Sequence, residues 1–88
     1  MSTKPPSPVA EFAPETLERI AYTAVEEIPT QEPNDRNRLG FSVWMWLVDR
    51  KGSLAQAIKN SGTRTNSSPD EILKIVSKRL EEKGIKLS

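Results

Sequence analysis

Apolar side chains recur at three- and four-residue steps in two long segments of the chain, which is the spacing of one face of a helix. In the first of these segments the apolar positions are Leu17, Ile20, Ala21, Ala24, Val25 and Ile28. Pro14 suits the first position of a helix, and Pro29 disfavours helical geometry in the residue before it. We therefore predict a helix from Pro14 to Ile28.

The C-terminal segment has a similar pattern. Ser68 can cap a helix that opens with Pro69, and the apolar positions that follow are Ile72, Leu73, Ile75, Val76 and Leu80. With Gly84 as a stop, this predicts a helix over residues 69–83. A shorter helix is predicted over residues 53–61, because Ser53 and Gln56 have capping-box spacing. Residues 62–68 form a polar loop between these two helices.

The most apolar ten residues, Leu39-Gly-Phe-Ser-Val-Trp-Met-Trp-Leu-Val48, admit two structures. A helix over about residues 36–51 lines one side with Leu39, Val43, Trp46, Leu47 and Arg50, and Gly52 is its stop. A strand over residues 41–49 would turn at residues 49–52. The segment after that turn is alanine-rich and a poor strand partner, so the helix is favoured. Before it, Pro33-Asn34-Asp35 is expected to be a turn, with Asn34 or Asp35 as the helix cap.

These elements predict an all-α fold, a small bundle of three to four helices that forms a single domain over residues 14–88. Residues 1–13 are expected to be a disordered tail, because the first twelve contain three prolines and few apolar groups. The longest apolar run has about ten residues, too short to cross a bilayer. The chain has no cysteine, which fits a reducing compartment, so we expect a soluble cytoplasmic protein that makes no membrane contact.

Composition also argues against catalysis. The chain has no histidine and no cysteine, so it lacks the commonest general base, the strongest nucleophile and the usual transition-metal ligands. The acidic pairs Glu26-Glu27 and Glu81-Glu82 consist of adjacent residues, which point about 100° apart on a helix and do not converge. We expect no enzymatic activity, no cofactor and no bound metal.

The two tryptophans suggest a binding role. On a helix, Trp44 and Trp46 project about 200° apart, so a compact bundle would not easily cover both indoles. If Trp46 faces inward, Trp44, Met45 and Val48 lie toward the sides or rear of the helix. An exposed aromatic patch is typical of an interaction surface, which predicts that a protein partner, or a second copy of the chain, binds there. The competing interpretation is a central helix with both indoles buried.

Charge distribution supports an alternative function. Residues 1–37 carry three basic and seven acidic side chains, whereas residues 38–88 carry ten basic and five acidic ones. In outline, the two helices over residues 53–83 resemble a helix-turn-helix arrangement, which would bind nucleic acid through Arg64, Thr65, Asn66, Lys74 and Lys78. Two features disfavour this hypothesis: the loop is longer than the usual three or four residues, and Asp70 and Glu71 place negative charge where phosphates would lie. A protein partner is therefore favoured.

Overall fold

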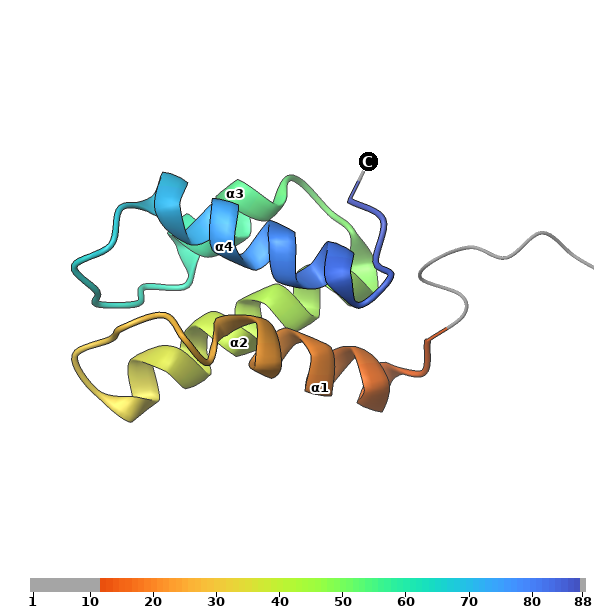
Figure 1. Cartoon of the computed structure of the whole chain (residues 1–88), viewed down its shortest axis with the longest axis horizontal. Helices are drawn as coiled ribbons and strands as arrows, with labels where there is room; N and C mark the ends of the chain where they lie inside the picture. The colour runs from red at the N-terminus through yellow and green to blue at the C-terminus, as the bar shows by residue number, and fades with distance from the viewer. Residues whose placement is uncertain (1–11, 88) are drawn as a thin grey trace, which may run out of the picture.

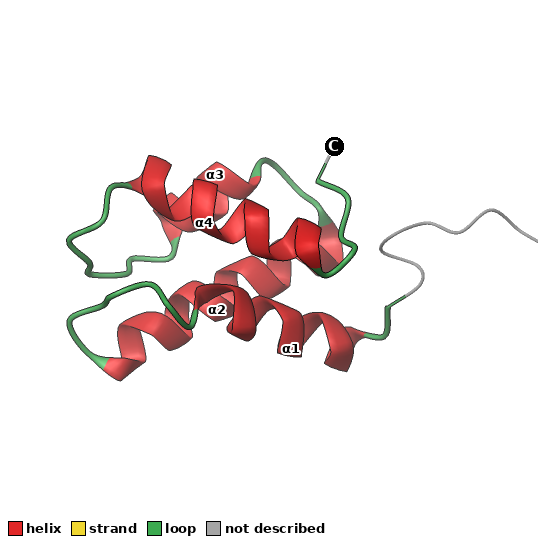
Figure 2. Cartoon of the chain, in the orientation of Figure 1, coloured by secondary structure: helices red, strands yellow, loops and turns green. Residues whose placement is uncertain are grey.

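The structure, a computed structural model, describes residues 12–87 and contains four α-helices and no strand within that range (Figures 1 and 2). The helices are α1 (Pro14–Val25), α2 (Pro33–Asp49), α3 (Leu54–Asn60) and α4 (Pro69–Glu82). The predicted all-α fold is confirmed, and residues 41–48 are helical. Of the predicted tail, residues 1–11 lie outside the described residues, whereas Phe12 packs against the hydrophobic core.

The four helices form a ring in which each one packs against two others. Helices α1 and α3 both contact α2 and α4. Figure 1 shows α1 with α2 as one layer and α3 with α4 as the other. All four helices contribute buried apolar side chains to one core, which Ile28 and Ile85 extend beyond the helix ends.

Helix α2 supplies the inward stripe that its sequence predicts. Leu39, Val43 and Leu47 are fully buried, and Trp46 is almost so. Burying one such side chain stabilises a fold by about 1.5–3 kcal/mol relative to leaving it exposed. We call these four residues the inner stripe; they hold α2 against the rest of the ring.

Helix α1 ends earlier than the sequence predicts, and helix α2 begins earlier than the sequence predicts. Helix α1 ends at Val25, and tighter turns follow, in which Glu26 N–H donates to Thr23 O and Ile28 N–H donates to Val25 O. Helix α2 begins at Pro33, so Pro33-Asn34-Asp35 is its first turn and the prediction of a separate turn is wrong. Neither Asn34 nor Asp35 is the N-cap residue, which is Glu32. Asp35 contributes from the third helical position, where it accepts a hydrogen bond from Glu32 N–H (3.2 Å).

The C-terminal end of α2 also differs from the prediction. The helix stops at Asp49, because Arg50 rather than Gly52 adopts the first left-handed conformation (φ 55°, ψ 30°). The Arg50 guanidinium lies 4.5 Å from the centroid of the Trp46 ring and donates to Lys86 O (2.7 Å). This side chain therefore links the end of α2 to the C-terminal segment.

The predicted caps of α3 and α4 are confirmed. Ser53 accepts from Gln56 N–H (3.1 Å), and Ser68 accepts from Glu71 N–H (3.2 Å). Helix α4 ends in a Schellman motif, in which Gly84 N–H donates to Glu81 O and Ile85 N–H donates to Leu80 O, both at 3.0 Å. Gly84 has φ +89°, which glycine tolerates, and the motif folds Ile85 back into the core.

A buried glycine lets α1 and α2 approach each other closely. A Cβ atom at Gly40 would lie 2.5 Å from Cδ1 and 2.7 Å from Cε1 of the Tyr22 ring. Both distances are shorter than van der Waals contact, so a larger residue would force the two helices or the ring to move. Tyr22 therefore occupies the space that the missing side chain of Gly40 leaves.

Replacing this glycine with alanine should destabilise the fold. We expect Gly40→Ala to lower the free energy of unfolding by about 1–3 kcal/mol through overpacking, measured by urea denaturation. In a Tyr22→Ala background the same change should be neutral or stabilising, by up to about 1 kcal/mol, because alanine favours a helix over glycine. An equal loss in both backgrounds would show that Tyr22 does not cause the constraint.

Candidate functional site

Helix α2 has a second apolar stripe, on the side opposite the inner stripe. Phe41, Trp44, Met45 and Val48 are spaced at i, i+3, i+4 and i+7, which places them on one side of the helix. We call these four residues the outer stripe. The side chains at its two ends are the most open, with Phe41 49% and Val48 44% exposed. Trp44 and Met45 are half-buried.

Trp44 is held on the side of the stripe that faces α1. Its indole Nε1–H donates to Pro14 O (3.0 Å), and its side chain packs against the hydrophobic core. The Phe41 ring meets the Trp44 ring edge-on, with 5.9 Å between centroids and an interplanar angle of 82°. Trp44 is thus a partly exposed residue with a fixed orientation and a structural role of its own.

Trp46 lies on the opposite side of α2 and has a different environment. It is 7% exposed, and its Nε1–H donates to Gly52 O (3.1 Å). The ring of helices therefore buries one indole almost completely and covers the other in part. The interpretation with both indoles buried does not describe this arrangement, in which Trp46 faces inward and Trp44 is partly exposed.

A groove of about 290 Å³ runs beside the outer stripe, between α2 and α3. Phe41, Met45 and Trp46 line it from α2, and Gln56, Ala57 and Asn60 line it from α3. Phe41 and Met45 belong both to the groove and to the outer stripe. The two features therefore form one continuous, largely apolar surface.

Trp44, Met45 and Val48 lie on the side of α2 that their spacing predicts, and Phe41, which was not predicted there, joins them. The spacing of Phe41 from Trp44, Met45 and Val48 was a usable signal, because three, four and seven residues separate positions on the same helix face. Phe41 is the most exposed large apolar residue among those described.

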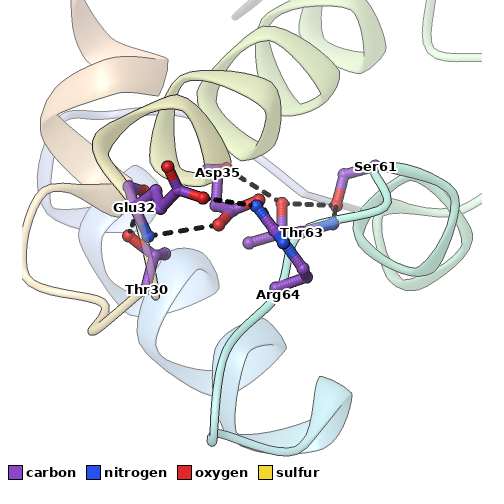
Figure 3. A network of polar contacts seen from close by, with 6 residues as sticks. All are labelled: Thr30, Glu32, Asp35, Ser61, Thr63 and Arg64. Carbon is purple, nitrogen blue, oxygen red and sulfur yellow. Dashed lines mark hydrogen bonds and ion pairs between the residues drawn. The ribbon is translucent and has the colours of Figure 1, made fainter.

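The residues proposed for nucleic-acid binding lie elsewhere, and two of them make internal contacts. Arg64 donates through Nη2 to Glu32 Oε2 (2.9 Å) and through Nε to Asp35 Oδ1 (3.3 Å), as Figure 3 shows. The Thr65 hydroxyl donates to Pro29 O. The loop between α3 and α4 is thereby tied to the connection between α1 and α2.

Asn66, Lys74 and Lys78 are exposed, the two lysines on α4. Lys78 lies in a shallow pocket with Glu27 and Glu82, which reduce the net positive charge there. Because Arg64 is paired with two carboxylates, it is not free to contribute its charge to a phosphate-binding surface. The helix-turn-helix hypothesis stays a prediction that these contacts do not favour.

Asp35 is the single buried charged side chain among the described residues, and Arg64 is its partner. Burial of Asp35 acts to raise the pKa of its carboxyl group. The hydrogen bond and positive charge of Arg64, together with the N–H of Glu32, outweigh that effect and hold the pKa below its ordinary value. Thr63 adds a hydrogen bond to the Asp35 carbonyl oxygen (3.1 Å). The ionised form of Asp35 therefore stabilises the folded state.

Residues 12–87 contain neither a metal-binding cluster nor a membrane-spanning helix. No group of three histidine, cysteine, aspartate or glutamate side chains is arranged to hold a metal ion. None of the four helices is both long and apolar enough to cross a membrane. The outer stripe with its groove is thus the candidate site that the geometry favours.

Comparison with known proteins identifies no relative: no protein-family model, curated protein or solved structure matches this chain.

The lowered pKa of Asp35 predicts loss of stability in acid. The pKa of the Asp35 carboxyl group is lower in the folded state than in the unfolded state. The resulting stability is fully present above the unfolded-state pKa, and it is lost as the pH falls through the folded-state pKa. We expect Asp35→Asn to lower the melting temperature at pH 7, and the gap to wild type to shrink as the pH falls below the ordinary aspartate pKa and Asp35 becomes protonated. Thermal melts over this range measure the gap. Glu81→Gln, at an exposed position, is the control; a gap for Asp35→Asn that stays constant would contradict the prediction.

Proposed function

We propose that this protein is a non-enzymatic interaction module that binds a protein partner, or a second copy of itself, through the outer stripe of α2. The observation that carries the proposal is the exposure of Phe41 and Val48, 49% and 44%, at the two ends of one apolar helix face. Scattered apolar side chains are normal on a protein surface, but a contiguous stripe is typical of a binding site.

The shape of the stripe favours a helical partner. Partner helices commonly contact a groove through residues at i, i+3, i+4 and i+7, and the outer stripe itself has that spacing. The groove between α2 and α3 offers a second row of contacts beside it, with Ala57 as a small apolar floor residue. A partner helix lying along α2 would cover both features at once.

Trp44 supports this function by fixing the surface before binding. Its hydrogen bond to Pro14 O and its edge-on contact with Phe41 restrict the rotamers of two large aromatic side chains. A surface ordered in advance loses less conformational entropy on association, so more of the burial energy appears as affinity. We therefore assign Trp44 a supporting role and place the most accessible contacts at Phe41 and Val48.

A photo-crosslinker at residue 41 tests the proposal. The chain would carry benzoylphenylalanine in place of Phe41 and be irradiated in an extract of the cells that naturally make it. We expect a covalent protein adduct at residue 41, and we expect Val48→Glu in the same chain to abolish it by placing a charge in the interface. The melting temperature should change little, because Val48 is exposed.

The matched control carries the same photo-crosslinker at Lys74, which is exposed on α4, away from the outer stripe. Adducts of equal yield at residues 41 and 74, or none at residue 41, would show that the outer stripe is not a binding surface.

A further inference from the structure

Charged side chains lie near both ends of the outer stripe, and Lys51 lines the groove together with Asp49. Arg38 lies before Phe41 and Asp49 lies directly after Val48, and both side chains are exposed. Eleven residues separate them, which is about three full helical turns, so both side chains leave α2 on the same flank. Within the described part of the chain, neither takes part in an ion pair.

We propose that the occupant of the outer stripe is a second copy of this chain, whose α2 packs on this one in the antiparallel direction. The inference rests on the proposed function and names its partner. Closed two-fold dimers are the commonest protein oligomers, and in them the same patch on each copy faces the other. The patch must therefore be complementary to itself.

Antiparallel packing satisfies that condition for charge. In this dimer the two-fold axis passes between the two helices, at right angles to both. The same flanks of the two helices then meet, and the order of residues along them is reversed. Arg38 then faces Asp49 of the partner subunit, and Asp49 faces the partner's Arg38. One contact of opposite charges is thus repeated at both ends of the interface.

The same register also aligns the apolar side chains. The midpoint between Arg38 and Asp49 lies within one residue of the midpoint between Phe41 and Val48. The axis that pairs the charges therefore places Phe41 close to the partner's Val48, with Trp44 and Met45 near the axis. Apolar contact and charge pairing thus favour one arrangement of the two copies.

Parallel packing lacks this complementarity. In a parallel dimer the two-fold axis runs parallel to the two helices. Each flank of α2 then meets the opposite flank of the partner's α2, and residues with the same number lie at the same level along the axis. Arg38 would then lie near the partner's Asn37, which carries no charge, and no acidic side chain of α2 would be in reach. Among the charges of α2, opposite signs thus meet in the antiparallel arrangement and not in the parallel one.

Exchanging the charges tests this arrangement. Sedimentation equilibrium of the full chain should show a concentration-dependent dimer. Arg38→Glu places glutamate against the partner's Asp49, and Asp49→Arg places arginine against the partner's Arg38. Because each change creates two like-charge contacts per dimer, we expect each variant alone to dimerise about tenfold or more weakly at low salt.

Mixing the two variants is the decisive measurement. In a heterodimer of Arg38→Glu with Asp49→Arg, both contacts again join opposite charges, so an equimolar mixture should recover the affinity of the wild type. A single chain that carries both substitutions should recover that affinity as well.

Asp49 also accepts a hydrogen bond from Lys51 N–H, so Asp49→Arg could fail to fold. In that case Asp49→Asn is used instead, because it removes the charge and keeps a hydrogen-bond acceptor. That variant should dimerise more weakly than the wild type.

The control is Lys74→Glu, a charge reversal on α4, which should leave the dimer unchanged. A wild-type chain that is monomeric at millimolar concentration would overturn the antiparallel dimer. So would an equimolar mixture of the two variants that does not regain the dimer affinity of the wild type.

The photo-adduct at residue 41 distinguishes this proposal from the proposed function. An adduct with a different protein would support the interaction surface and overturn the second copy, whereas a dimer that forms without the outer stripe would overturn both.

Discussion

Helix α2 is apolar along two opposite sides, and α1 and α3, the two helices that it contacts, leave much of one side exposed. The inner stripe contributes Leu39, Val43, Trp46 and Leu47 to the core, while α1 and α3 pack on the two flanks. On the outer side, Phe41 and Val48 stay 49% and 44% exposed, whereas Trp44 is partly covered where it donates to Pro14 O of α1. The packing that forms the core therefore also leaves the outer stripe accessible.

Both ends of α2 are fixed by contacts with distant parts of the chain. At the N-terminal end, Asp35 binds Arg64 of the loop between α3 and α4 (Figure 3). At the C-terminal end, Arg50 stacks on Trp46 and donates to Lys86 O. A helix held at both ends presents its outer face with little freedom to rearrange, which favours specific over adaptable binding.

Local sequence signals located all four helices but not all of their ends. Ser53 and Ser68 were predicted caps, and both accept the expected backbone hydrogen bond. Pro33 was assigned to a turn, because proline suits both a turn and the first position of a helix. At the start of α2, Asp35 accepts a hydrogen bond from Glu32 N–H, and its side chain is also buried against Arg64, a residue far along the sequence. A local pattern does not contain that contact.

The sequence by itself determined the helical class, the inner stripe and the side of α2 on which Trp44, Met45 and Val48 lie. These follow from residue spacing, which a helix converts directly into direction. Only the tertiary structure decided how much of each side chain stays exposed. Trp44 is half-buried because α1 supplies Pro14 O as its partner, whereas Phe41 has no such cover and remains 49% exposed. Exposure depends on where the neighbouring helices pack, and that is set by contacts between residues distant in the sequence.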